Sequence, residues 1–299
     1  MKSKLFFTAL FLLFSTAGFA QAFNQEVTLE GKKPFLLGKI NKEGFTQENY
    51  PWFNENYQAY PINSTAIDTL ERHLDKYTIT AFMGTWCGDS KRETPRFYKV
   101  LEQANFPLER LTMVAVSRDR ETYKQSPGGE HESLNIHRVP TFIIYKNGKE
   151  VNRIVESPVE TLEEDLVKII QKEYTPNYHG VTLVNDMLTE MNLNKFNKKQ
   201  RKLLPKLKEL VTNMYELNTY ANVLFYAHKK EEAIIVARLN TLLYPEEPKT
   251  YVSLANKLSQ NADPEGAMEN YKKALSLDPE NEEYKKTFLE LQGLRNGTQ

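Results

Sequence analysis

Hydrophobic positions follow two different patterns along the chain, and the change between them divides it into two parts. Up to about residue 174, short apolar runs such as 78–83 and 111–116 alternate with segments whose apolar residues recur every three to four positions. The short runs predict buried strands, and the longer period predicts helices. Beyond that point only the helical period continues. The pattern therefore predicts an α/β region followed by an all-helical region.

The elements predicted for the α/β region alternate in type. Ser64 is a helix N-cap candidate, and Asn147-Gly148 suits a tight hairpin turn between two strands. Alternating strands and helices favour a parallel core, to which the hairpin adds an antiparallel edge. The predicted order is helix 64–75, strand 78–83, helix 91–104, strand 111–116, polar loop 117–133, strand 140–145, strand 151–155 and helix 162–171. Residues 23–61 are aromatic and rich in turn residues, with one candidate strand at 35–40.

The first 22 residues have the pattern of a secretory signal peptide. Lys2 and Lys4 precede an apolar run at 5–14, and small residues follow, with cleavage expected after Ala20 or Ala22. An uncleaved membrane anchor is the alternative interpretation. We expect the mature protein to be periplasmic or secreted, with no stable membrane span after signal cleavage.

The charge balance and the histidine spacing bear on whether the chain binds nucleic acid or metal ions. Lysine plus arginine equals aspartate plus glutamate at 39 each, so no net charge draws the chain to nucleic acid, and no nucleic-acid partner is expected. The five histidines have no spacing typical of metal ligands. We therefore expect no metal and no cofactor. His131 and His137 precede Pro140, so either is a candidate base that approaches Cys87, with an ordinary surface position as the alternative.

The segment Trp86-Cys87-Gly88-Asp89-Ser90 contains the only cysteine among 299 residues. It lies between the strand predicted at 78–83 and the helix predicted at 91–104. A helix N-terminus offers free N–H donors and a partial positive charge, which favour a thiolate. A buried, unreactive cysteine is the alternative. A dithiol enzyme carries a second cysteine three positions on, and that position is Ser90 here.

Four motifs together resemble the thioredoxin superfamily over residues 64–173. They are Trp86-Cys87-Gly88, Pro95 eight residues after Cys87, Val139-Pro140-Thr141 and the hairpin Tyr145-Lys146-Asn147-Gly148-Lys149. The resemblance implies an α/β thioredoxin fold, with a central mixed sheet flanked by helices. It also implies a cis-proline at Pro140, with a simple turn proline as the alternative.

The same resemblance assigns roles to site residues. It implies that Cys87, with Trp86 and Ser90, is catalytic, and that Val139, Pro140, Gly88 and Asp89 bind an extended substrate. Ser90 either hydrogen-bonds the thiolate or satisfies backbone N–H groups at the helix start. Glu93 is a candidate proton relay or a solvated helix residue. Ser90 and Ala81 depart from the family pattern, since thioredoxins often place a cysteine and a buried aspartate there.

The helical region repeats with a period of 34 residues. Ala221 corresponds to Ala255, and Ala233 to Ala267, which is the period of tetratricopeptide repeats. Generic helical hairpins are the alternative. Before these repeats we expect helices at 183–191 and 198–214, with Pro205 interrupting or restarting the second. The domains predicted are a signal peptide at 1–22, a lead segment at 23–61, a thioredoxin-like domain at 62–174, a helical connector at 175–213 and tetratricopeptide-like repeats at 214–299.

The leading functional hypothesis is a monothiol protein of the cell envelope that forms mixed disulfides with client proteins or small thiols. It would be a thiol–disulfide oxidoreductase without a resolving cysteine, and its partners would be proteins that carry disulfides or thiols. The alternative is a non-catalytic scaffold that binds peptides or a protein partner through the thioredoxin fold and the helical repeats. Peroxide reduction is weaker, because Gly84 occupies the place where peroxidases of this superfamily have a threonine.

Overall fold

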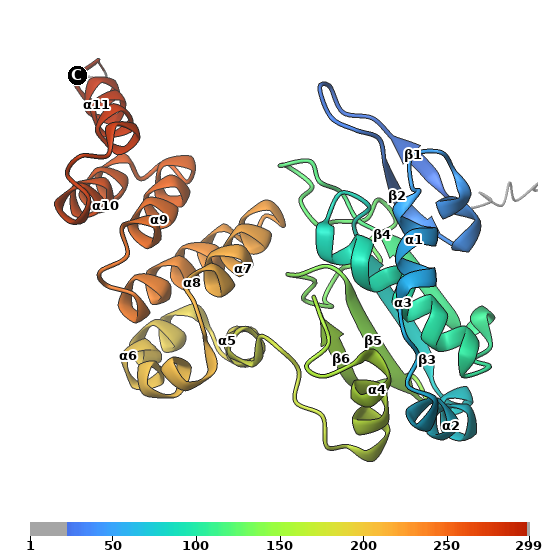
Figure 1. Ribbon diagram of the computed structural model, residues 1–299. Helices are drawn as coiled ribbons and strands as arrows, with labels where there is room; N and C mark the ends of the chain where they lie inside the picture. The colour runs from blue at the N-terminus through green and yellow to red at the C-terminus, as the bar shows by residue number, and fades with distance from the viewer. Residues whose placement is uncertain (1–22, 298–299) are drawn as a thin grey trace, which may run out of the picture.

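The computed structural model describes residues 23–297. The predicted signal peptide at 1–22 lies outside these residues. Figure 1 shows two regions: a sheet with its helices, and a curved stack of helices that continues to the C-terminal end. Within residues 23–297, no helix has both the length and the apolar character needed to cross a membrane.

A six-stranded mixed sheet forms the first region, with strand order β1-β2-β4-β3-β5-β6. Only β3 and β4 pair in parallel, and the other neighbours are antiparallel. The prediction of a mixed sheet flanked by helices is confirmed. The strands are β1 (Gln25–Val27), β2 (Phe35–Ile40), β3 (Thr78–Met83), β4 (Leu111–Ala115), β5 (Thr141–Lys146) and β6 (Lys149–Val155).

Side chains of the central strands alternate between two cores on opposite faces of the sheet. In β3, Ala81 and Met83 face the larger core, whereas Phe82 faces the smaller one. Helices α1 to α4 pack into the larger core, while Ile136 and Val139 of a long loop cover the smaller core. The helices are α1 (Trp52–Ala59), α2 (Ser64–His73), α3 (Gly88–Gln103) and α4 (Leu162–Gln171), with short 3-10 turns at Lys42–Thr46, Leu74–Lys76 and Leu108–Arg110.

Residues 23–61 belong to the same folded unit as the rest of the sheet. Strand β2 pairs with β4, and Phe45 and Phe53 stack at 4.5 Å between ring centres within the larger core. The predicted strand at 35–40 is β2, whereas the sequence did not predict β1. The aromatic residues of this segment therefore fill the core that α3 also covers.

A separate hydrophobic core holds the helical region together. Ala221, Ala233, Ala255 and Ala267 are fully buried there, which lets neighbouring helices approach closely. The prediction that Pro205 interrupts a helix is wrong: α6 runs through this exposed position, where the ring does not meet packed neighbours. The helices are α5 (His179–Glu190), α6 (Leu193–Leu210), α7 (Tyr215–Tyr226), α8 (Lys230–Leu243), α9 (Pro248–Gln260), α10 (Pro264–Leu277) and α11 (Glu282–Gly297).

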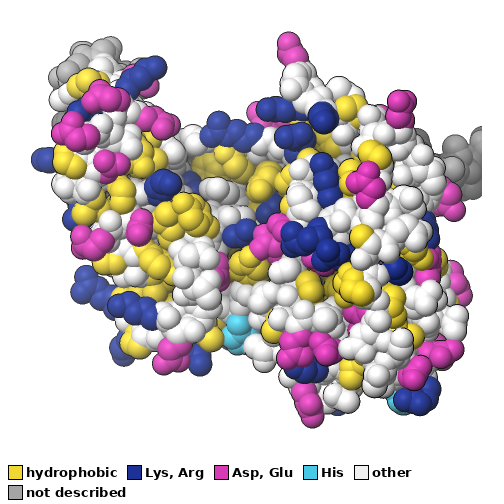
Figure 2. Space-filling model, in the orientation of Figure 1, with side chains coloured by type: hydrophobic (Ala, Val, Ile, Leu, Met, Phe, Trp, Pro, Cys, Tyr) yellow, Lys and Arg dark blue, Asp and Glu magenta, His cyan; other side chains and the backbone are white. Residues whose placement is uncertain are grey.

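The two regions meet where α7 approaches the loop that follows β4. Arg120 Nε donates to Tyr226 Oη at 2.6 Å, and Gln125 Nε2 donates to the Tyr226 carbonyl oxygen at 2.7 Å. Arg138 Nη2 donates to the carbonyl oxygen of Tyr215 at 3.2 Å. Figure 2 shows a hollow between the regions, with hydrophobic and basic side chains along it.

Candidate functional site

Cys87 is the N-cap residue of α3, immediately after the turn that follows β3. Its backbone N–H donates to the Gly84 carbonyl oxygen at 2.8 Å, which closes the turn. A Cβ at Gly84 would lie 2.6 Å from the Trp86 ring, so a side chain there would displace the ring. The sulfur is therefore held at a helix N-terminus, partly exposed, by a turn that needs glycine at position 84.

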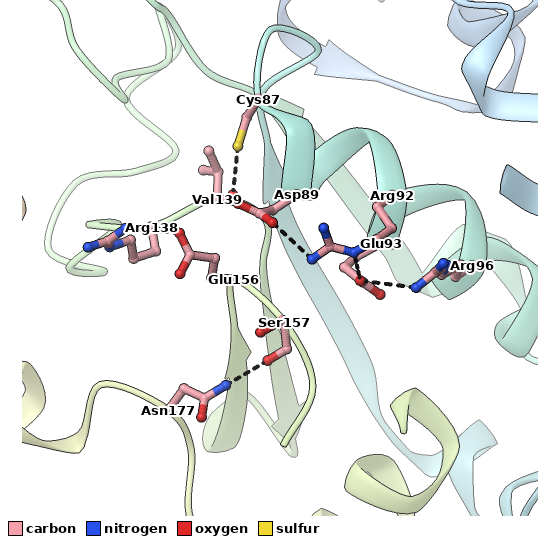
Figure 3. Close-up of polar contacts among 10 residues, drawn as sticks. All are labelled: Cys87, Asp89, Arg92, Glu93, Arg96, Arg138, Val139, Glu156, Ser157 and Asn177. Carbon is pink, nitrogen blue, oxygen red and sulfur yellow. Dashed lines mark hydrogen bonds and ion pairs between the residues drawn. The ribbon is translucent and has the colours of Figure 1, made fainter. Parts of the chain in front are cut away.

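The loop before β5 faces this sulfur. The Val139–Pro140 peptide bond is cis, and the Cys87 thiol donates to the Val139 carbonyl oxygen with Sγ and O 3.3 Å apart. Figure 3 shows the sulfur pointing at this carbonyl. The two residues are 52 positions apart in the chain, so the fold alone brings them together. We call residues 137–140 the prolyl loop.

Trp86 braces the other side of the turn. Its Nε1 donates to the Val116 carbonyl oxygen at 2.9 Å, and its ring lies 5.9 Å from that of Tyr123. Tyr123 belongs to the loop after β4, and burial raises the pKa of its hydroxyl. The Trp86 ring thus joins the turn at residues 84–88, which we call the active turn, to that loop.

Ser90 is fully buried at the start of α3. Its Oγ accepts the Gly84 N–H at 3.1 Å, so it satisfies a backbone donor of the turn. Gly88 is exposed and has open space where a Cβ would be, beside the sulfur. A substrate can therefore reach the backbone at Gly88, whereas the Ser90 hydroxyl is buried and already hydrogen-bonded.

Acidic residues of α3 pair with arginines on the same helix. Asp89 accepts from Arg92 at 2.9 Å, and Glu93 pairs with Arg92 at 2.6 Å and with Arg96 at 3.3 Å. In Figure 3, the Glu93 carboxylate is turned toward the two arginines and away from Cys87. The structure therefore does not bring Glu93 to the sulfur.

Sequence reasoning missed four residues around the sulfur: Tyr123, Lys124, Arg138 and Glu156. Arg138 of the prolyl loop pairs at 3.0 Å with Glu156, which directly follows β6 (Figure 3). Lys124 is buried, and this burial lowers the pKa of its ammonium to about 7. The loop that carries Tyr123 and Lys124 has no periodic pattern, so no sequence signal identified either residue.

His137 of the prolyl loop and His131 of the loop before it make ring contacts and hydrogen bonds with residues other than Cys87. His137 is 2% exposed, with its ring 5.7 Å from Tyr178 and 6.0 Å from Tyr220 in the helical region. His131 Nδ1 accepts the Ser126 N–H at 3.1 Å within its own loop. Burial lowers the pKa of both imidazoles, to about 3 for His137.

A cavity of about 810 Å³ lies at the junction of the two regions. The loop after β4 forms one wall with Lys124 and His131, and helices α5 and α7 form another with Asn185 and Tyr220. Pockets that bind ligands are common at such domain junctions. Lys124 lines this cavity and also binds the prolyl loop that faces Cys87.

Comparison with known proteins agrees with this geometry. The family model of thioredoxin matches residues 62–172. Mitochondrial thioredoxin-2 of Schizosaccharomyces pombe is 30% identical over 94 residues, which are 31% of this chain and 63% of that protein. Thioredoxin-1 of the same yeast is 29% identical over 92 residues, covering 31% of this chain and 80% of the relative. Thioredoxin of Chlamydia trachomatis is 33% identical over 91 residues, covering 30% and 76%.

Proposed function

The chain belongs to the thioredoxin family, and from this premise we propose that it exchanges thiols and disulfides through Cys87 alone. A thioredoxin domain indicates thiol–disulfide chemistry. The observation that carries the proposal is the position of Sγ, at the N-terminus of α3 and 3.3 Å from the Val139 carbonyl oxygen. Serine at position 90 leaves the sulfur without an intramolecular thiol to resolve a mixed disulfide.

The exchange proceeds in two balanced steps. The Cys87 thiolate attacks one sulfur of a client disulfide, a new bond to Cys87 forms, and the client's S–S bond breaks. The departing client sulfur leaves as a thiolate and takes a proton from water. A second thiolate, from a small molecule or a dithiol protein, then attacks the client sulfur of the mixed disulfide: a new S–S bond to that sulfur forms, the bond to Cys87 breaks, and Cys87 leaves as a thiolate. Without that second thiol the adduct persists.

The prolyl loop and the active turn would hold the client. An extended segment would pair with the backbone of Val139 next to Pro140, while Gly88 and Asp89 would form the opposite edge. Trp86 would brace the turn through its bond to Val116. Ser90 would leave the adduct intact, because a hydroxyl does not displace a thiol.

We further propose that the protein works in the cell envelope, either in the periplasm or after secretion. The signal-like pattern at 1–22 supports this location. The paired helices α7/α8 and α9/α10, with equivalent buried alanines 34 residues apart, support tetratricopeptide-like repeats that bind a protein partner.

A second candidate function is peptide binding without exchange, which the cavity of about 810 Å³ favours. One experiment separates the two functions. Wild type and Cys87→Ser are incubated with an unfolded model protein that contains disulfides, and complexes are resolved on non-reducing gels and by light scattering. Exchange predicts a covalent complex for wild type alone, which a reductant dissolves. Equal non-covalent retention by both variants, without a covalent complex, would refute exchange and support the scaffold.

A further inference from the structure

The loop after β4 carries a lysine that is buried beside the Cys87 site. Lys124 is 5% exposed, and its Nζ donates to the His137 carbonyl oxygen at 2.5 Å. The ammonium also lies 5.0 Å from the centre of the Tyr123 ring. Lysine is rarely buried to this extent without a counter-charge, because desolvation penalises the ammonium.

Lys124 and Cys87 both donate hydrogen bonds to the backbone of the prolyl loop. The lysine binds the carbonyl of His137, and the thiol binds the carbonyl of Val139, two residues further on. The residues that precede them also touch, since the rings of Tyr123 and Trp86 lie 5.9 Å apart. The ammonium and the sulfur are therefore within electrostatic reach of each other.

The other charged groups around this pair are already neutralised. On α3, Asp89 pairs with Arg92 at 2.9 Å. Arg138 of the prolyl loop pairs with Glu156 at 3.0 Å, and on β6 Arg153 pairs with Glu150 at 2.6 Å. Of the ion pairs formed by the described residues, none involves Lys124.

The neighbouring titratable groups carry no charge at neutral pH. Burial lowers the pKa of His137 to about 3 and raises the pKa of Tyr123, so the imidazole and the phenol are both neutral. Below its pKa of about 7, Lys124 is thus left as the buried cation without a fixed anion next to Cys87.

We propose that Lys124 is a positioning residue for the exchange reaction, and that its ammonium is the counter-charge of the Cys87 thiolate. This inference rests on the proposed function. A thiolate at Cys87 gives the buried ammonium the anion that it lacks, and each charge makes the other less costly to bury. When Cys87 enters a mixed disulfide, its negative charge passes to the leaving sulfur, and Lys124 loses its counter-charge.

The test compares two buried lysines of this chain. Lys257 is 4% exposed in α9, and burial lowers its pKa to about 8, but its Nζ donates to Asn222 in the helical core. Rates of Cys87 alkylation by iodoacetamide are measured from about pH 5 to pH 9 in the full chain, as wild type, Lys124→Met and Lys257→Met. Alkylation reports the thiolate without requiring disulfide exchange.

We expect Lys124→Met to be alkylated roughly three- to tenfold more slowly than wild type near pH 6, from the loss of one charge. The two rates should converge at high pH, where burial has made Lys124 neutral and no charge at position 124 distinguishes the two proteins. Lys257→Met should follow the wild-type curve. A Lys124→Met profile equal to that of wild type over the whole range would overturn the inference.

A second measurement uses the wild-type protein and does not depend on how the variants fold. Side-chain NMR of labelled lysines follows the titration of Lys124 before and after Cys87 is blocked with neutral iodoacetamide. Because coupling between two sites is reciprocal, the Lys124 midpoint should move to lower pH after blocking, while that of Lys257 stays. An unchanged Lys124 midpoint contradicts the inference. A failure of Cys87 to form mixed disulfides would instead refute the exchange function.

Discussion

Acidification should weaken the fold through the fully buried imidazole of His137. Its Nδ1 lies 3.1 Å from the Asn135 carbonyl oxygen, and its Nε2 has no hydrogen-bond partner within the described part of the chain. Burial lowers the pKa of His137 to about 3, whereas an unfolded chain holds a histidine pKa of about 6.5. Between these values the unfolded chain binds the proton and the folded chain does not.

The sign and size of the effect follow from this difference. The stability that neutral His137 provides is fully present above about pH 6.5 and is lost as pH falls toward 3. Between about pH 6.5 and pH 3, each pH unit changes the free energy of unfolding by about 1.4 kcal/mol. Acidification from pH 7 to pH 5 should therefore lower the free energy of unfolding by about 2 kcal/mol. His137→Phe keeps a ring against Tyr178 and Tyr220 but cannot bind the proton. In this variant, the free energy of unfolding should therefore not fall by the part that protonation of His137 causes.

Urea unfolding of the full chain at pH 7 and pH 5 measures the difference. Both tryptophans, Trp52 and Trp86, belong to the sheet region, so their fluorescence reports unfolding of that region. His73→Phe is the matched control, because His73 is exposed. If His137→Phe loses as much stability between the two pH values as wild type does, the buried imidazole is not the cause and the reasoning fails.

Two further substitutions test the stability of each region, one in the core of the sheet region and one at a helix N-cap of the helical region. The Phe97 ring stacks on that of Phe142 at 3.9 Å in the core, so Phe97→Ala should cost about 3–5 kcal/mol in the tryptophan-detected urea transition. The exposed Val159→Ala serves as the control, and an equal effect of both variants would contradict this packing. Asp263 caps α10 by accepting the Gly266 N–H at 2.9 Å, so Asp263→Ala should cost about 1 kcal/mol in helix unfolding followed by circular dichroism. Asp263→Ser should restore most of that loss, and an unaltered transition in Asp263→Ala would show that the cap is not stabilising.

The central strands and their helices could be predicted because their hydrophobic pattern reflects burial directly. Strand β3 is buried on both faces, and α4 presents one apolar face, which the runs and periods at 78–83 and 162–171 encode. Strand β1 has a largely exposed side-chain pattern, so it lacks that signal. Pro205 misled because an exposed proline ring can be accommodated within a helix whose other face is packed.

The site was predictable where its residues lie in local motifs. Trp86, Cys87 and Gly88 share one turn, and Val139 and Pro140 are the motif that the fold brings to it. The charged surroundings were not predictable, because Lys124 and Arg138 come from a loop without period. Their position depends on tertiary contacts with the prolyl loop and the helical region.

Exchange through Cys87 alone is tested most directly by the intact mass of the protein after incubation with oxidised glutathione at pH 7. A reactive Cys87 should give one glutathione adduct per chain, located on Cys87 by peptide mapping and absent from Cys87→Ser. The adduct should persist without added thiol and disappear when a dithiol is supplied. If wild type forms no adduct under conditions that modify an exposed cysteine in a short unstructured peptide, Cys87 does not exchange with disulfides.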